Sequence, residues 1–337
     1  MSFHIVSIDS PQCSISCRDG QLVRKAPGEP DKSLPIEDVA SIIITSFSAQ
    51  IHSQLFLEAA KHGVALIICE AFKPVSLVLP ANRSTDTLLT RALLKIDVKT
   101  VARFWQATID AKCRNQYLLA EHMRTEDGGL AALREAAWSR KPHKEAICAK
   151  MFWQIFGRTA AGGQAAVSDQ STLNCPHEDP PRTSRGLEFQ PATSPFTRER
   201  SGGGLNNLLN YGYAVLLSTV LQKLFGVGLD PTFGISHVTR ERCTPLAYDL
   251  MEPFRPCVDW RIVQWVRQHP AAESWEVTPE FRKWVTAFPL DRVEYLELTL
   301  DVRSCIEGVV RGFRRAVLTG DGKHYKPWTP KNSKWAG

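Results

Sequence analysis

The stretch Val75–Ile96, with the sequence VSLVLPANRSTDTLLTRALLKI, contains the change of pattern that decides the fold. It begins with a short apolar run that is typical of a strand, and Pro80–Asp86 is a loop rich in polar residues. From Leu88 the apolar residues recur at the three- and four-residue spacing of a helix. The chain is therefore predicted to be α+β. The predicted parts are a β-strand-rich N-terminal domain at 1–83, a linker at 84–90 and a larger all-α domain at 91–320.

Upstream of this boundary, the residues predict short strands around one helix. Val39–Ile44 and Val64–Cys69 are β-branched apolar runs, which are typical of buried strands. Asp19-Gly20 separates two shorter runs and predicts a tight hairpin. Residues 50–63 have helical spacing and end in a glycine that suits a C-cap.

Downstream of the boundary, the periodicity predicts helices. Residues 88–123 are too long for one typical helix, so a break is expected near Asp97–Thr100. Leu205–Phe225 is apolar almost all round and should be a buried central helix. Val293–Arg315 is expected to form a long helix. Shorter helices are expected at 130–137, 143–156, 258–268 and 281–288.

Two segments lack periodic apolar residues. Residues 160–195 contain Gly162-Gly163 and many prolines and small polar residues, so they are expected to form a long loop or a disordered insertion. Residues 321–337 are rich in Gly, Pro and Lys and are expected to be a flexible tail.

The composition describes an ordinary soluble globular protein with 43% hydrophobic and 23% charged residues. A net charge of +6 permits a polyanionic partner such as nucleic acid. No signal peptide is recognisable, and no apolar run reaches the ~20 residues of a membrane span. Nine scattered cysteines favour reduced thiols in the cytoplasm, and Cys13 and Cys17 lack the second pair that a zinc site would need.

Basic side chains recur along residues 88–123. They are Lys95, Lys99, Arg103, Lys112 and Arg114. The residues by themselves favour a solvated helix face as the interpretation of this pattern.

The stretch His237–Pro256 concentrates groups that could hold a cation. Asp249 and Glu252 are three residues apart, so they share one face if Leu246–Met251 begins a helix. Two carboxylates among apolar residues are costly unless a partner such as a divalent cation offsets their charge. Glu145, on an otherwise apolar helix face, is the candidate for a third ligand. An alternative stays open at this point, since such a glutamate is often a capping residue and a lone histidine is often a core residue.

A series of sequence blocks extends over essentially the whole chain. In order they are Phe104-Trp-Gln106, Lys112-x-Arg114-Asn-Gln116, Glu145-Ala-x-x-Ala-Lys-x-x-Trp153, Phe196-x-Arg198-x-Arg200, Asn206–Ala214, Gly228-Leu-Asp-Pro231, Gly234-x-x-His237 and Asp249–Pro256. Together they resemble the CRISPR-associated adaptation integrases, the "Cas-one" endonucleases that insert new spacers into CRISPR arrays.

This resemblance implies a metal-dependent DNA endonuclease and integrase. Glu145, His237 and Glu252 would be the ligands of Mg²⁺ or Mn²⁺, with Asp249 as the neighbouring catalytic acid. The enzyme would join the 3′-hydroxyl ends of new spacer DNA to the CRISPR repeat by transesterification, and it would also nick DNA. The implied partners are spacer-precursor and repeat DNA, a second copy of the chain bound through the N-terminal domain, and a small "Cas-two" protein.

DNA contacts are expected from basic and polar side chains in and around these blocks. They are Arg83, Lys150, Arg198, Arg200, Asn210, Tyr211 and Arg255. Such contacts are independent of sequence and weaken with salt. The chain departs from the family pattern at Lys150, where many members have arginine, and in the insertion at 160–195.

Two other functions are compatible with the same residues. In the first, the protein is a catalytically idle DNA-binding scaffold whose acids and histidine serve only structure. In the second, it is a metal hydrolase of small esters that does not bind DNA. The intact Glu/His/Glu set favours the integrase, because a scaffold has little reason to keep a buried charge cluster.

Overall fold

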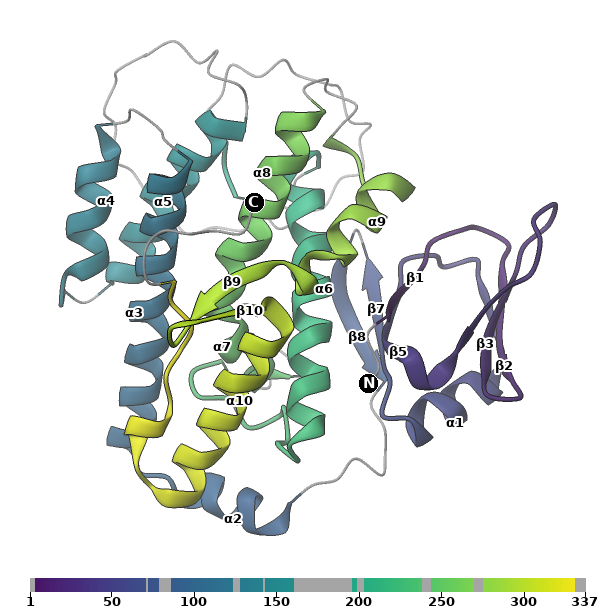
Figure 1. Ribbon diagram of the computed structural model, residues 1–337, viewed down its shortest axis with the longest axis horizontal. Coiled ribbons are helices and arrows are strands. Elements are labelled where there is room, and N and C mark those ends of the chain that lie inside the picture. Colours follow the sequence, from purple (N-terminus) through teal and green to yellow (C-terminus); the bar gives the residue numbers. More distant parts are fainter. Residues whose placement is uncertain are drawn as a thin grey trace, which may run out of the picture.

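The computed structural model describes residues 4–70, 72–78, 86–123, 128–141, 143–160, 196–198, 203–237, 244–269 and 275–330. A strand-rich N-terminal part lies beside a larger bundle of helices (Figure 1). The α+β class predicted from the sequence is therefore confirmed. The predicted loop within 160–195 falls almost entirely outside the described residues.

The first sheet joins the two parts of the molecule. Its strand order is β1-β5-β7-β8; β1, β5 and β7 are parallel, and β8 is antiparallel to β7. The strands are β1 (His4–Ile8), β5 (Val39–Ile44), β7 (Ala65–Glu70) and β8 (Lys73–Val78). Every residue of β5 is buried. Because successive side chains point to opposite faces, Ile43 packs in the core of the helical part, whereas Ile42 and Ile44 pack in the N-terminal core.

The second sheet completes the N-terminal part. Its order is β4-β3-β2-β6, with β2 (Ser14–Arg18), β3 (Gln21–Lys25), β4 (Lys32–Pro35) and β6 (Gln50–Ile51). The predicted hairpin is confirmed, since Asp19 and Gly20 connect β2 to β3 with φ of 49° and 73°. A 3-10 turn (Ile36–Asp38) precedes β5, and helix α1 (Ser53–Lys61) is followed by Gly63 at φ 69°.

The helical part surrounds α6 (Leu205–Gly226), which is buried on nearly all sides as expected (Figure 1). The predicted break before residue 100 is confirmed, because Asp97 caps a new helix by accepting the Thr100 N–H at 3.0 Å. The remaining helices are α2 (Thr87–Lys95), α3 (Val98–His122), α4 (Gly129–Trp138), α5 (Lys144–Ala160), α7 (Pro245–Met251), the 3-10 turn η2 (Glu252–Phe254), α8 (Arg255–Gln268), α9 (Pro279–Thr286), the 3-10 turn η4 (Phe288–Leu290), α10 (Val302–Thr319) and the 3-10 turn η5 (Gly322–His324).

The single long helix predicted for Val293–Arg315 is wrong. This segment begins with a β-hairpin, β9 (Arg292–Tyr295) and β10 (Leu298–Asp301), and only then becomes α10. Leu296 and Glu297 take positive φ at the turn, which a continuous helix excludes. The helix begins after Asp301, whose carboxylate accepts the Ser304 N–H at 2.8 Å.

The segment after α10 also differs from the flexible tail that was expected. Residues 321–330 pack on the helical part, where Tyr325 and Trp328 are buried. The Trp328 indole donates to the Glu294 carbonyl at 2.9 Å, and Asn115 of α3 donates to the Trp328 carbonyl at 2.9 Å. The rest of the tail, 331–337, lies outside the described residues.

Two further expectations concern the cysteines and the membrane. Cys13 and Cys17 are buried and free, in agreement with the prediction of reduced thiols. Within the described residues, no helix combines the length and the apolar character that crossing a bilayer would require.

Candidate active site

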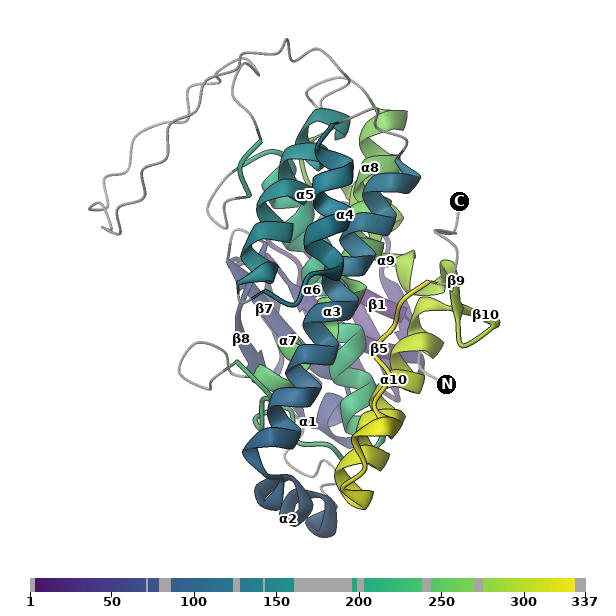
Figure 2. The same cartoon turned by 90° about the vertical axis from the view of Figure 1, so that its left-hand side faces the viewer.

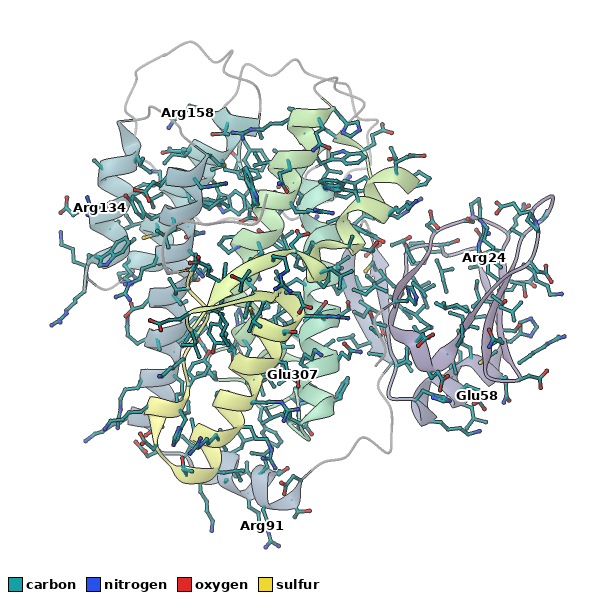
Figure 3. The ribbon with its side chains drawn as sticks, in the orientation of Figure 1. Arg24, Glu58, Arg91, Arg134, Arg158 and Glu307 are labelled. Carbon is teal, nitrogen blue, oxygen red and sulfur yellow. The ribbon has the colours of Figure 1, made fainter. Side chains whose placement is uncertain are left out.

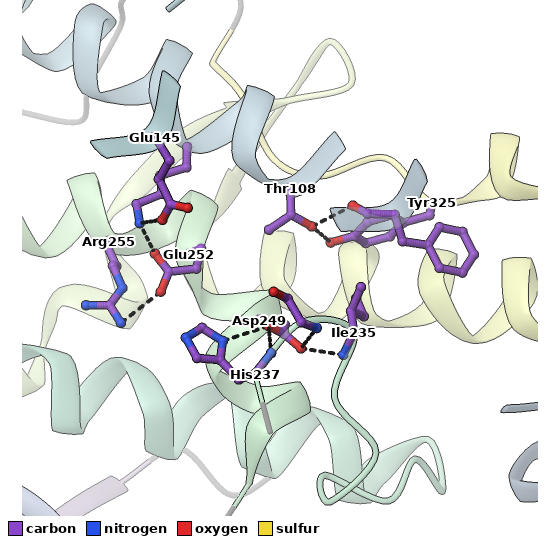
Figure 4. A network of polar contacts seen from close by, with 11 residues as sticks. Thr108, Glu145, Ile235, His237, Asp249, Glu252, Arg255 and Tyr325 are labelled. Atoms are coloured by element: carbon purple, nitrogen blue, oxygen red, sulfur yellow. Dashed lines mark hydrogen bonds and ion pairs between the residues drawn. The ribbon is translucent and has the colours of Figure 1, made fainter. Parts of the chain in front are cut away.

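The residues predicted to carry the chemistry come from separate elements that meet between α3, α5 and α7 (Figure 4). Glu145 lies in the first turn of α5, and His237 ends the described part of the loop after α6. Asp249 lies on α7, and Glu252 begins the 3-10 turn that connects α7 to α8. Asn115 holds this turn against α3 by donating to the Pro253 carbonyl at 2.7 Å.

Lys112 of α3 lies between the two glutamates. Its Nζ is 2.6 Å from Glu145 Oε1 and 2.7 Å from Glu252 Oε2. The other oxygen of Glu252, Oε1, pairs with Arg255 Nη2 at 2.9 Å. Two carboxylates and two cations therefore form one connected group, in which the charges compensate one another.

This arrangement keeps Glu252 ionised although its side chain is buried. Burial favours the neutral acid, but the charges of Arg255 and Lys112 outweigh it and lower the pKa of Glu252 to about 2. Burial also disfavours the charged form of Lys112, yet Glu252 and Glu145 raise its pKa above the usual value. Glu252 and Lys112 therefore stay charged at neutral pH.

Asp249 organises the loop that carries His237. Its fully buried carboxylate accepts the backbone N–H groups of Ile235 at 2.5 Å, Ser236 at 3.0 Å and His237 at 3.2 Å. It also accepts the ring Nδ1–H of His237 at 2.7 Å. This bond assigns the proton to Nδ1, so the lone pair on Nε2 is left for a ligand. Gly234 is needed here, because a Cβ would collide with the His237 carbonyl and with Pro245.

Carboxylate oxygens and an imidazole nitrogen are suitable ligands for a divalent cation, but the three side chains are not close enough together to surround one. Both glutamates reach the same point, where the Lys112 ammonium lies, and Glu252 Oε2 meets this ammonium as an ion pair without an aligned hydrogen bond. A carboxylate oxygen of this kind can accept a cation. Across the described residues, however, no three His, Cys, Asp or Glu side chains lie close enough together to hold a metal ion. Binding a cation would therefore require Lys112 to move away from the carboxylates.

Arg255 connects this group to Arg198, one of the predicted DNA-contact residues. The guanidinium of Arg255 lies 4.7 Å from the ring centre of Tyr213, and that of Arg198 lies 5.5 Å from the same ring. The hydroxyl of Tyr213 donates to buried Asp259 at 2.6 Å, and burial raises the pKa of Asp259 to about 7.

The amides at the start of α6 orient Arg198. Its two terminal nitrogens donate to Asn206 Oδ1 at 2.9 Å and to Asn210 Oδ1 at 2.8 Å. Of the predicted DNA contacts, Arg198, Asn210 and Arg255 are thus brought together beside Glu252. Lys150 is exposed on α5.

The other predicted DNA contacts are placed differently. Tyr211 has no exposed surface and packs edge-on against Phe72 in the turn between β7 and β8, with ring centres 6.0 Å apart, so its position gives no support for a DNA contact. Arg83 and Arg200 lie outside the described residues.

Lys112 is the site residue that the sequence analysis missed, because it was interpreted as part of a solvated face. The position of Lys112 on the helix indicates that it lies next to a buried face. Thr108, Ala111 and Asn115 are buried on α3, and position 112 is four residues after the first and three before the last. A lysine at the edge of a buried helix face requires an anionic partner, and the glutamates on other elements provide it.

Comparison with known proteins was made by sequence and by structure. The sequence matches the profile of the family described as "CRISPR associated protein Cas1" over residues 6–158 and 194–282, which is more than half of the chain. A relative from Neisseria meningitidis serogroup C (strain 8013), named CRISPR-associated endonuclease Cas1, is 25% identical over 321 residues. The match covers 93% of this chain and 91% of the relative.

Two solved structures illustrate the likeness in fold. A casposase bound to integration product superimposes with a TM-score of 0.65 and 17% identity, over 100% of this chain and 95% of that one. A chain of a "Cas6-RT-Cas1--Cas2 complex" gives a TM-score of 0.71 and 13% identity, over 97% of this chain and 36% of that one. At these identities the likeness shows the fold alone.

Proposed function

The chain belongs to the CRISPR-associated Cas1 family, and from this premise we propose that it is a metal-dependent DNA endonuclease and integrase of spacer acquisition. The substrates would be the 3′-hydroxyl ends of new spacer DNA and the phosphodiester bonds of the CRISPR repeat. The observation that supports this most directly is the convergence of Glu145 and Glu252 on one point, within 2.6 and 2.7 Å of Lys112 Nζ.

The cation site would be formed by Glu145, Glu252 and the Nε2 atom of His237. Mg²⁺ or Mn²⁺ bound there would polarise a phosphodiester and stabilise the charge that develops during its cleavage. Asp249 would act through His237, because it holds the ring through Nδ1 and leaves Nε2 as the atom that would bind a cation. These three ligands are the ones that the family resemblance predicted from the sequence.

The remaining charged residues would bind and orient the DNA. Arg198 and Arg255 present guanidinium groups next to Tyr213, which suits phosphate oxygens next to the reacting bond. The nucleophile would be the 3′-hydroxyl of the incoming DNA in strand transfer and water in nicking, so no side chain has to attack. Exposed Lys150 would add a sequence-independent contact.

The proposed assembly is a homodimer joined by a small Cas2 partner on DNA. The structural match to a chain of a Cas1–Cas2 complex and to a casposase bound to integration product supports this proposal through the shared fold. A cytoplasmic location remains a prediction from the sequence.

The test uses Glu252→Ala on a supercoiled plasmid that carries a CRISPR array, with and without the partner, in EDTA, Mg²⁺ and Mn²⁺. We expect the variant to lose nicking and strand transfer by at least about a hundredfold, because a ligand is removed, while DNA affinity changes little. Glu280→Ala, at an exposed position in α9, is the matched control and should behave as wild type.

Two outcomes would contradict the proposal. Unchanged nicking by Glu252→Ala would exclude Glu252 as a ligand. Wild-type protein that binds DNA but nicks it with neither Mg²⁺ nor Mn²⁺ would favour the second candidate function, the catalytically idle scaffold. In that case Lys112 would permanently neutralise the two glutamates.

A further inference from the structure

The positive charge of the chain is concentrated at its C-terminal end. Residues 311–337 contain seven of the 41 Lys and Arg residues but one of the 35 Asp and Glu residues. Their formal charge of +6 equals that of the whole chain, so residues 1–310 are neutral in total. A surplus confined to one segment produces a local field, which a surplus spread over the surface would not.

The structure collects part of this charge around a groove, which we call the α10 groove. It is a cavity of about 370 Å³ between α10, the turn of the β9–β10 hairpin and the η5 segment. Its cationic lining residues are Arg311, Arg315, Lys323, His324 and Lys326, and no carboxylate lines it.

Three of these cations are exposed and lack a carboxylate partner within the part of the chain that is described: Arg315, Lys323 and Lys326. Their neighbours on α10 are different. Arg311 pairs with Glu307, labelled in Figure 3, at 2.8 Å, and Arg314 pairs with Asp86 at 3.1 Å. The unpaired cations therefore gather on the groove side of the segment.

The backbone explains why these side chains face outward. Tyr325 is extended and buried, and its hydroxyl lies 2.8 Å from the Thr108 hydroxyl of α3. The residues on either side of Tyr325, His324 at the end of η5 and Lys326, line the groove instead. Gly312 lets this segment approach α10 closely, since a Cβ there would collide with the His324 carbonyl.

We propose that the α10 groove binds the phosphate backbone of DNA, as a contact separate from the one at the glutamates. This rests on the proposed function, which supplies the DNA. In Figure 2, α10 and the hairpin lie on the side of the helical part away from β8. A duplex or single strand that crosses this face would be held without any contribution from Glu145, His237 or Glu252.

The lining favours DNA over a protein partner. The core of a protein–protein interface is depleted of charged residues, whereas protein–DNA interfaces are polar and strongly positive. Cations that no carboxylate neutralises are also the groups whose phosphate contacts release counterions, which drives such binding.

The test is the triple variant Arg315→Gln, Lys323→Gln, Lys326→Gln in the full chain. Binding of a fluorescein-labelled random-sequence duplex is measured over a series of salt concentrations. Each lost phosphate contact should reduce the slope of log K against log salt by about 0.9, so we expect a slope lower by roughly 2 to 3. Affinity near physiological salt should fall about ten- to a hundredfold.

The control variant removes the same charge elsewhere. Lys25→Gln, Lys32→Gln, Lys61→Gln changes three exposed lysines of the N-terminal part, which pair with Asp31, Glu29 and Glu58 (Glu58 is labelled in Figure 3). Its slope should stay near that of wild type. Equal melting temperatures of the two triple variants check that both are folded.

The possible results separate this inference from the proposed function. A triple variant with the slope of the control, or one that loses affinity for poly-glutamate but keeps it for DNA, overturns the α10 groove as a DNA site. If wild type nicks plasmid DNA in that case, the proposed function stands. Wild type that binds no DNA at all overturns both.

Discussion

Single buried charges determine the state of the candidate site. Glu252 is buried between Lys112 and Arg255, and Asp249 is buried among backbone N–H groups and the His237 ring. Each acid therefore has its own set of partners, so the two acids differ in role although they are three residues apart. Asp249 holds a loop, and Glu252 faces the point where Glu145 also arrives.

Replacing Lys112 with methionine should expose the competition between the ammonium and a divalent cation. Glu252 loses one of its two cations and Glu145 loses its partner, so the free energy of unfolding should fall by about 3 kcal/mol. Mn²⁺ should then raise the melting temperature of Lys112→Met more than that of wild type, because it no longer has to displace an ammonium. Thermal unfolding monitored by circular dichroism, with and without Mn²⁺, measures both effects.

Lys150→Met is the matched control for this variant. Lys150 is exposed on α5, so its loss should change stability by no more than about 0.5 kcal/mol. Equal Mn²⁺ shifts for Lys112→Met and wild type would show that Lys112 does not compete with the cation.

Close packing of α6 against α8 supports the site at the scale of helices. Gly212 lies on α6 where a Cβ would come within 2.5 Å of Val258 Cγ1. The same pair of helices carries the bond from Tyr213 to Asp259, and the Tyr213 ring lies next to Arg198 and Arg255. A shift of α8 would therefore also displace Arg255 from Glu252.

Gly212→Ala should separate these two helices. Overpacking should lower the free energy of unfolding by about 1–3 kcal/mol. The higher helix propensity of alanine offsets up to about 1 kcal/mol of this loss. Urea unfolding measures the difference. Gly226→Ala, at the end of the same helix where a Cβ meets nothing within 4 Å, is the control and should be neutral or stabilising. A neutral Gly212→Ala would mean that the helices can adjust without cost.

The whole molecule is held together by one sheet and one C-terminal segment. The first sheet contributes to both hydrophobic cores, and Arg282 of α9 forms an ion pair with Asp9 of the N-terminal part. On the other side, residues 321–330 close the helical part, where Trp328 stacks on Phe254 with ring centres 5.4 Å apart. Phe254 belongs to the turn that carries Glu252, so this segment also supports the site.

Trp328→Ala tests that closure. Loss of a fully buried indole, with its hydrogen bond to Glu294, should lower the free energy of unfolding by about 3–5 kcal/mol. Trp138→Ala, at a half-exposed position, should cost much less. Urea unfolding followed by circular dichroism compares them, and similar losses for both would mean that the segment contributes little.

Local patterns predicted most of the elements, because their causes lie within a few residues. The β2–β3 hairpin follows from Asp19-Gly20, and the start of α3 follows from the Asp97 cap. The prediction was wrong at Val293–Arg315, where the apolar residues fit either period and only the turn at Leu296 and Glu297 separates strand from helix.

The sequence by itself determined the α+β class, and it supplied the acids and the histidine around which the candidate site is built. Only the tertiary structure decided that Lys112 lies between Glu145 and Glu252, that Tyr211 faces the sheet, and that the tail through Trp328 is buried. The physical reason is the distance along the chain over which each effect acts. Periodicity and capping act over one or two turns, whereas the partner of a buried charge can come from any element that packs against it.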